Sequence, residues 1–379
     1  MKNKENDPAV SQSKHSDSKH IFIFDAEEGM VLAEDIIAED GTILVPASTR
    51  LTIDLIMKIS NHHILEIRII DAPIQDTKKV TDRAEDEPEN YFEKVRKTES
   101  YRVFQENFNS DVQALKDSLN DIILKNMPVN AEALLDNMHK LIRSQRNNLQ
   151  LMDMLHSMRS SDDQVYAHCI NVALISTIIG TWMDMPQKDI DILTLSGLLH
   201  DIGKLLVPND ILSKPGRLNA VEFEQIKQHP FLGFMKLKEQ DIDNRIKDAC
   251  LYHHEKCDGT GYPYGLKGDD IPVFAKIVSI ADVYDAMTSN RVYRKSICPF
   301  DVVKSLSVDA FTKFDPEYLI PFLQKVVSSY IHNNVMLSNG QTGEVILIND
   351  NSLSQPVVRC GSDYINLIKH PELRITAIL

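Results

Sequence analysis

The chain has 379 residues, a hydrophobic content of 43% and a formal net charge of −14. Its length corresponds to roughly two to three domains of an ordinary globular protein. The acidic balance disfavours binding of polymeric DNA or RNA, which depends on basic patches that displace counterions, but a local group of basic side chains can still hold a small anionic ligand.

The N-terminal region and the cysteines carry no targeting or redox signal. Residues 1–20 are polar, lack the apolar core of a signal peptide and predict a disordered tail. The apolar stretch 172–179 is interrupted by Ser176 and Thr177, so no membrane insertion is predicted. Five scattered cysteines predict neither a disulfide framework nor a zinc knuckle, and the reducing cytoplasm is the expected compartment.

Residues 21–71 predict a small α/β accessory module. Asp40-Gly41 marks a hairpin between two short strands, Thr52 is a candidate cap of a short helix, and residues 64–70 alternate as a strand does. The polar, acidic residues 72–90 predict a linker.

The next region predicts helices, in a connector over residues 91–160 and a helical bundle over residues 161–334. Three amphipathic stripes mark the connector, and residues 165–183 are apolar almost all round, as in a buried helix. The stripes are Val112, Leu115, Leu119 and Ile122; Leu135, Met138 and Ile142; and Leu149, Met152 and Leu155. Short strand patterns return after Val335, so residues 335–379 predict a small β-rich C-terminal segment. The expected fold class is therefore mainly α.

The helical bundle holds ionisable residues spaced by about one helix and its loop. They are His168, His200, Asp201, His229, His253, His254 and Asp282. A bundle can direct such residues into one cavity, and burying them without partners would be costly. Imidazole and carboxylate ligands suit Fe or Mn, with Co, Ni or Zn as alternatives. This number of ligands predicts two divalent metal ions, an arrangement that hydrolyses phosphate esters.

A single buried histidine is more often a satisfied core residue than a ligand, so the prediction depends on the whole set. The doublet His62-His63 has no such companions and is not predicted to bind metal. Adjacent helical residues point about 100° apart, so His253 and His254 are expected to face different ions. Glu255 is expected to hold a histidine rather than a metal.

Five motifs together are similar to those of a known family. They are HDIGK at 200–204, HP at 229–230, HHEKCDGTGYP at 253–263, ADVYDAMTS at 281–289 and RVYRK at 291–295. Over residues 165–322 the chain resembles the HD-GYP family, a subgroup of the HD superfamily of metal-dependent phosphohydrolases. The resemblance implies an HD-type helical catalytic domain that hydrolyses cyclic di-GMP to pGpG, in some members on to GMP, by attack of a metal-bridging hydroxide.

The resemblance also implies roles for individual residues. The seven residues of the bundle fall on the family's metal positions, with Asp201 as the bridge between the ions. Lys204 falls on the residue that contacts phosphate or protonates the leaving oxygen, although spacing alone leaves open a solvated lysine at a helix end. Arg291 and Arg294 match a phosphate-binding pair, for which a surface basic patch is the alternative.

Two further residues are candidates for the substrate pocket, and one position departs from the family. Asp285 and Tyr262 are assigned to substrate binding, with orientation of a ligand histidine or of a water molecule as another role for Asp285. Some members have a glutamate four residues before the upstream histidine that recruits a third metal. Gln164 stands there in this chain, and a neutral amide is a poor ligand, so two ions are predicted.

Two rival functions remain open from the sequence. One is a cyclic di-GMP sensor without turnover, although such degenerate members lose the His-Asp pair or GYP, and both are present in this chain. The other is a hydrolase of a different nucleotide, such as cyclic GMP-AMP, because base contacts lie outside these motifs. The N-terminal module is a candidate for homodimerisation or for binding a protein partner.

Overall fold

The structure is a computed structural model of the whole chain. It describes residues 18–22, 26, 29–37, 43–52, 55–56, 59, 66–70, 90–158, 164–212, 214, 219–288 and 298–379. The predicted linker 72–90 lies outside these residues except for Asn90, and so does the hairpin turn at Asp40-Gly41. By its contacts the chain forms two compact units. One lies within residues 1–85, and the other holds the described residues from Asn90 onward.

The first unit contains two small antiparallel sheets. Strand β1 (Ser18–Phe22) pairs with β4 (Glu66–Ile70), and β2 (Ile36–Ile37) pairs with β3 (Ile43–Val45). β1 begins inside the predicted tail because pairing with β4 runs on to Ser18. The Oγ1 of Thr52 accepts a hydrogen bond from the backbone N–H of Leu55 at 3.3 Å, as expected of a helix cap.

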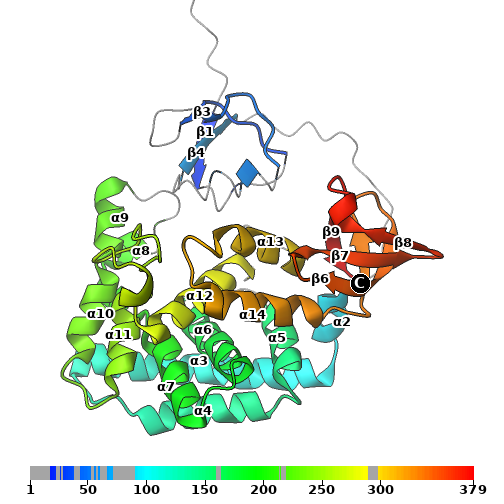
Figure 1. Ribbon diagram of the computed structural model, residues 1–379. Helices are drawn as coiled ribbons and strands as arrows, with labels where there is room; N and C mark the ends of the chain where they lie inside the picture. Colours follow the sequence, from blue (N-terminus) through cyan, green and yellow to red (C-terminus); the bar gives the residue numbers. More distant parts are fainter. Residues whose placement is uncertain are drawn as a thin grey trace, which may run out of the picture. The chain divides into compact units, whose positions relative to one another are not determined.

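The second unit is mainly helical, as predicted. Figure 1 shows its helices packed around α6, with a small sheet at one end. The helices before the predicted bundle are α2 (Tyr91–Arg96), α3 (Glu99–Lys125), α4 (Ala131–Arg143) and α5 (Asn148–Ser157). Those of the bundle are α6 (Gln164–Trp182), α7 (Gln187–Leu199), η2 (Ile202–Leu206), α8 (Asn209–Leu212), α9 (Ala220–Ile226), α10 (His229–Leu237), α11 (Asn244–Tyr252), η3 (Gly268–Asp270), α12 (Val273–Thr288), α13 (Pro299–Asp309) and α14 (Pro316–Ser328).

An antiparallel five-stranded sheet ends the chain, as the β-rich pattern predicted. Its strands are β5 (Asn334–Leu337), β6 (Thr342–Asn349), β7 (Ser352–Cys360), β8 (Asp363–Asn366) and β9 (Ile375–Ile378), in the order β8-β7-β6-β5-β9, with η4 (Leu367–Lys369) after β8. β7 packs on α13 and α14. The sheet and helices α2–α5 share one hydrophobic core with the bundle, so no boundary between the three predicted domains is visible in the contacts. The boundaries at 160 and 334 stay predictions.

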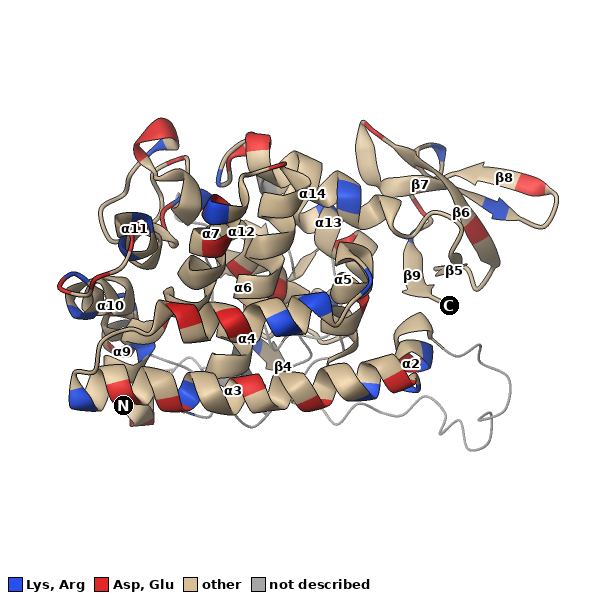
Figure 2. Cartoon of the chain, turned by 90° about the horizontal axis from the view of Figure 1, so that it is seen from below, with Lys and Arg blue, Asp and Glu red and all other residues tan. Residues whose placement is uncertain are grey.

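Helix α3 shows how the local sequence determines these elements. The side chain of Thr98 caps its N-terminus, and Asn126 ends it in a left-handed conformation two residues before Pro128. The predicted stripe of Val112, Leu115, Leu119 and Ile122 is buried, as expected. Figure 2 shows acidic and basic residues interspersed along this helix, with no continuous basic stripe.

Helix α6 differs from its prediction in one respect. By length and composition alone, Val165–Trp182 is apolar enough to cross a bilayer, because the apolar run continues past Ser176 and Thr177. The Oγ1 of Thr177 donates to the carbonyl of Ala173 at 2.8 Å, so this hydroxyl is satisfied without interrupting the helix. Within the structure 72% of this segment is buried, as is usual for the core helix of a globular unit.

The crossing of α6 and α7 should tolerate no side chain at Gly197. A Cβ there would lie 2.5 Å from the Cα of Ala173, a backbone atom that cannot move alone. We therefore expect Gly197→Ala to lower the free energy of unfolding by about 1–3 kcal/mol in urea titrations. Gly180→Ala is the matched control, because the nearest neighbours of its Cβ would be side-chain atoms, of Leu193 at 3.1 Å, Ile190 at 3.4 Å and Met185 at 3.5 Å. Equal losses in both variants would contradict this account.

A buried histidine should make the second unit less stable in acid. His156 on α5 hydrogen-bonds Tyr284 on α12 at 2.9 Å and Tyr330 at 3.1 Å, and burial lowers its pKa to about 4. In the unfolded chain His156 binds a proton below about pH 6.5, whereas in the folded chain it binds one only below about pH 4. Stability is therefore lost as the pH falls through this window. Between about pH 7.5 and pH 5 the loss from this residue is about 2 kcal/mol.

The measurement is urea unfolding at both pH values for the wild type and His156→Gln. The variant keeps a hydrogen-bonding side chain but has no proton to gain, so its stability should fall less on acidification. The same pH dependence in both proteins would rule out this role for His156.

Candidate metal centre

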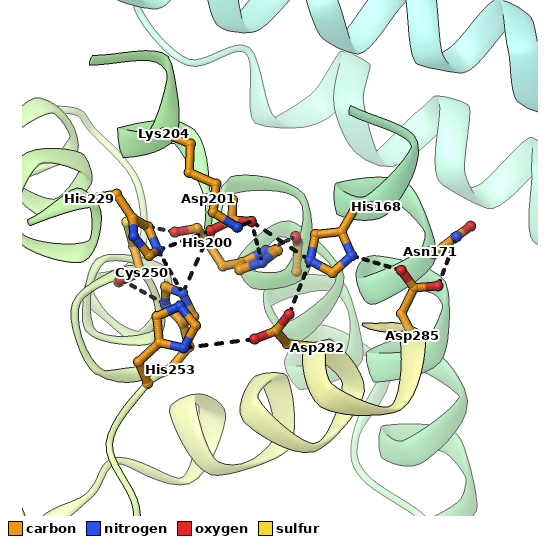
Figure 3. Close-up of polar contacts among 12 residues, drawn as sticks. His168, Asn171, His200, Asp201, Lys204, His229, Cys250, His253, Asp282 and Asp285 are labelled. Atoms are coloured by element: carbon orange, nitrogen blue, oxygen red, sulfur yellow. Dashed lines mark hydrogen bonds and ion pairs between the residues drawn. The ribbon is translucent and has the colours of Figure 1, made fainter. Parts of the chain in front are cut away.

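Three buried histidines of the predicted set are held by the backbone of their own turn. His200, His229 and His253 each donate the Nδ1 proton to a backbone carbonyl three residues earlier, at 2.7–2.9 Å. A carbonyl only accepts, so the Nε2 atom of each ring is left with a lone pair. These Nε2 atoms converge on one carboxylate, that of Asp201 (Figure 3).

Asp201 lies between two groups of side chains. Its Oδ1 is 3.1 Å from the Nε2 of His229 and 3.7 Å from that of His253. Its Oδ2 is 3.2 Å from the Nε2 of His200 and 3.7 Å from that of His168. The two oxygens therefore face different histidines, which is the geometry of a carboxylate that can bridge.

The ligand atoms form two clusters that could each hold a cation. One is Asp201, His229, His253 and His254, and the other is His168, His200 and Asp282. Asp282 on α12 reaches both, with Oδ1 3.0 Å from the Nε2 of His168 and Oδ2 3.9 Å from the Nδ1 of His254. The structure thus brings together all seven residues that were predicted from the sequence.

The two adjacent histidines do not divide as the sequence predicted. His253 and His254 fall in the same cluster, and their ring centroids lie 4.1 Å apart. The expectation assumed a continuous helix, but α11 ends at Tyr252 and His253 is only its cap. His254 belongs to the turn that follows, where helical spacing no longer fixes the direction of a side chain.

The electrostatics of the centre favour the neutral forms of His253 and His254 beside ionised carboxylates. Burial, followed by the neighbouring imidazoles, holds the pKa of His253 and of His254 well below the ordinary value. Burial would raise the pKa of Asp201, but His200 and Lys204 outweigh it and hold that pKa well below its usual range. The pKa of Asp282 is likewise lowered, mainly by its hydrogen bond with His168, against the effect of burial.

This donor set fits divalent cations. Neither the Nε2 of His200 nor the Oδ1 of Asp201 makes a hydrogen bond within the described part of the chain, although both atoms are buried. The Nε2 atoms of His229 and His253 lie only 3.3 Å apart. Buried lone pairs and carboxylates that face one another without protons are stable when a cation lies between them.

Lys204 brings a positive charge to this centre. Its Nζ donates to the Oδ2 of Asp201 at 2.5 Å, and the side chain keeps 24% of its surface exposed. Burial lowers its pKa, but Asp201 and Asp282 outweigh burial and raise the pKa above the ordinary value. The lysine is therefore charged and is not the solvated helix-end residue that the sequence left open.

Tyr262 and Glu255 shape the loop that follows the histidine doublet. The Tyr262 ring stacks on His254 with centroids 4.7 Å apart, which leaves its predicted substrate contact as a prediction. The buried carboxylate of Glu255 accepts hydrogen bonds from the backbone of Tyr264 and Leu266 at 2.8 and 2.9 Å. Glu255 was expected to hold a histidine, but it holds this loop instead.

The remaining predicted substrate residues have different outcomes. Arg291 and Arg294 lie outside the described residues, and the side chain of Gln164 is not described either. Asp285 is buried, with Oδ2 accepting from His168 and Oδ1 accepting from Asn171. Both oxygens thus take part in hydrogen bonds inside the protein, in agreement with the alternative of orienting a histidine, and the predicted substrate contact stays a prediction.

Two neighbours of the centre were missed in the sequence. Cys169 is buried, and its Sγ lies within 4.8 Å of a ligand atom of His200 and of Asp201. Asn171 donates a hydrogen bond to Asp285. Asn171 stands three residues after His168, a spacing that brings two side chains to one helix face and could have drawn attention to it.

Comparison with known proteins supports the interpretation of this cluster as a metal centre. The family model of the HD domain matches residues 124–318, slightly more than half of the chain. A cyclic di-GMP phosphodiesterase of Pseudomonas aeruginosa is 34% identical over 203 residues, 53% of this chain and 49% of that protein. One of Thermotoga maritima is 35% identical over 210 residues, 52% of this chain and 56% of that protein.

A third relative is named for a different substrate. A 3'3'-cGAMP-specific phosphodiesterase of Vibrio cholerae is 36% identical over 153 residues, 40% of this chain and 33% of that protein. The chain spans between 33% and 56% of the length of these three relatives. It belongs to the HD domain family, and within that family to the HD-GYP phosphohydrolases. The family implies divalent metal ions.

The histidine doublet should depend on the absence of a side chain at Gly261. A Cβ there would lie 2.4 Å from the Cα of Glu255 and 2.5 Å from the carbonyl oxygen of His254. Gly261→Ala should therefore displace the loop and weaken metal binding, by roughly 10-fold as for other residues that support ligands. Calorimetric titration with Mn²⁺ measures this. Gly340→Ala, whose added Cβ has open space but a φ of 83°, controls for a strained glycine far along the chain.

Proposed function

We propose that this chain is a metal-dependent phosphodiesterase that hydrolyses cyclic di-GMP to pGpG, with GMP as an alternative end product. The observation that carries the proposal is Asp201, whose two oxygens face separate histidine groups beside a charged lysine. The names of the relatives from Pseudomonas and Thermotoga supply the substrate class.

Two divalent ions, Fe or Mn before Co, Ni or Zn, are the proposed cofactors. The ligands proposed for them are the two clusters, between which the carboxylate of Asp201 is proposed to form the bridge. Bound there, such ions would make a nucleophile of water and offset the charge that develops on phosphorus. The absence of a glutamate at Gln164 supports two ions rather than three.

The side chains around the ions have separate tasks in this proposal. Lys204 is protonated and half-buried beside Asp201, so it can contact the scissile phosphate and deliver a proton to the leaving 3′-oxygen. Arg291 and Arg294 are proposed to bind the second phosphate with their planar guanidinium groups. Tyr262, stacked on His254, is proposed to border the substrate.

Hydrolysis of another cyclic dinucleotide is the second candidate. It is favoured by the relative named as specific for 3'3'-cGAMP, which differs from cyclic di-GMP in one base. The phosphodiester and the metal centre would be used in the same way, so the difference lies in base contacts alone.

We also propose a cytoplasmic location and no binding of polymeric nucleic acid, in accordance with the net charge of −14. Homodimerisation, or binding of a protein partner, is proposed for the N-terminal unit.

Loss of the bridging carboxylate should abolish turnover. Asp201→Ala and His200→Ala remove ligands that are worth several kcal/mol of transition-state stabilisation, so each should lower kcat/KM roughly 10³-fold. Lys204→Ala should lower kcat roughly 10²-fold, since it removes a proton donor. Chromatographic detection of pGpG and GMP, with Mn²⁺ and anaerobically with Fe²⁺, is the measurement.

The same assay decides between the candidates. His139→Ala is the control, because that histidine pairs with Asp191 away from the centre and its loss should leave turnover unchanged. Parallel reactions with 3'3'-cGAMP separate the second candidate from the first. Tight binding of cyclic di-GMP without product in either metal would identify a sensor and contradict the proposed enzyme.

A further inference from the structure

A buried amide stands behind one of the candidate ligands. Asn171 and His168 lie on the same face of α6, and both reach Asp285 on α12 (Figure 3). The Nδ2 of Asn171 donates to the Oδ1 of Asp285 at 2.9 Å, and the Nδ1 of His168 lies 2.7 Å from its Oδ2. Asn171 is 8% exposed and Asp285 is 5% exposed, so both are shielded from water.

The chemistry of these groups fixes the direction of each hydrogen bond. An ionised carboxylate only accepts, so Asn171 must present its NH₂ group and His168 must carry its proton on Nδ1. In the neutral ring that a metal requires, the lone pair of His168 is then on Nε2, the atom that lies 3.0 Å from Asp282 and 3.7 Å from Asp201. Asp285 thereby selects the tautomer that can bind a metal.

His168 differs from its neighbours in how its ring is held. His200, His229 and His253 are oriented by carbonyls of their own turns, which the helix itself fixes. His168 is oriented by a side chain, and rotation of a carboxylate about its last torsion is soft. A hydrogen bond to each oxygen is what fixes the plane of the Asp285 carboxylate.

We propose that Asn171 is a positioning residue of the metal centre: it fixes Asp285, which in turn orients His168 toward the ions. The inference rests on the proposed metal-dependent function but not on the substrate. Asn171 touches neither the ions nor the substrate in this scheme, and it acts only through Asp285.

A purely structural role accounts less well for this amide. The Oδ1 of Asn171 is buried without a hydrogen bond among the described residues, which is a loss of stability. An apolar side chain of similar size would avoid that loss at the crossing of α6 and α12. The feature that repays the loss is the NH₂ group directed at Asp285.

An exchange of the two side chains tests the proposal. Asn171→Asp places two carboxylates in contact. In Asp285→Asn the new amide must turn its oxygen toward His168, so its NH₂ group then faces the NH₂ group of Asn171. Each single change should lower Co²⁺ affinity at one of two bound equivalents by roughly 10-fold. The double variant Asn171→Asp/Asp285→Asn restores a donor opposite an acceptor and keeps an oxygen toward His168.

We therefore expect the double variant to lose no more Co²⁺ affinity than a single variant. Independent effects of the two changes would instead lower the affinity roughly 100-fold. Competition of Co²⁺ with a chelator, together with its visible spectrum, measures the affinity without any turnover. Thr177→Val is the matched control on α6. Its hydroxyl bonds Ala173 and Thr194 instead of the centre, so stability should fall while Co²⁺ affinity stays unchanged.

Three results would overturn the proposal: single variants that bind Co²⁺ like the wild type, a double variant that loses the product of both effects, or an equal loss in Thr177→Val. Wild-type protein that binds no divalent ion overturns the proposed function and this inference together. Intact coupling in a protein that hydrolyses no cyclic dinucleotide supports the inference and refutes the proposed function alone.

Discussion

The buried carboxylate of Asp201 is the interaction on which the rest of this protein depends. It is 1% exposed, and its two oxygens contact histidines that come from four different segments of the chain. An ionised group at this depth is costly unless opposite charge surrounds it. Lys204 supplies one fixed positive charge, but Asp282 and Asp285 add negative charge nearby. Burial lowers the pKa of His168, yet its hydrogen bonds with these two aspartates raise it to about 10, which reveals how strongly the cluster attracts cations.

The packing of the apolar helices holds those charged groups at fixed distances. α6 and α7 approach closely at Gly197, three residues before His200, so the histidine position follows from backbone contact. α12 carries Asp282, Tyr284 and Asp285 within one turn, and each side chain meets a different partner. Through Tyr284 and His156 it is joined to α5, so the helices before the bundle support the same helix that reaches the centre. The position of the centre thus depends on a core that extends well beyond its ligands.

The sequence predicted the members of the centre better than their arrangement. Spacing of one helix and one loop was sufficient to bring His168, His200 and His229 together, because bundle helices have few ways to place polar residues inside. The stripe of α4 was predicted one residue out of register, with Leu134 and Leu141 buried where Leu135 and Ile142 were expected, since both pairs lie at the edge of one apolar face. The partner of Asn171 could not be predicted, because contact between α6 and α12 depends on packing rather than on spacing.

The loop after the doublet shows why a motif can be recognised before its function is understood. Gly259, Gly261 and Tyr262 identify the family, yet the contacts of this loop are with its own protein. Gly261 lets the chain pass against the backbone of Glu255, whose carboxylate then holds the backbone of Tyr264. With the loop fixed in this way, the Tyr262 ring covers one face of His254. A histidine beyond the end of α11 has no helical turn to orient it. Stacking on Tyr262 therefore orients the ring of His254, as backbone carbonyls orient the rings of the other buried histidines. This requirement explains why a glycine, a buried acid and an aromatic ring occur together.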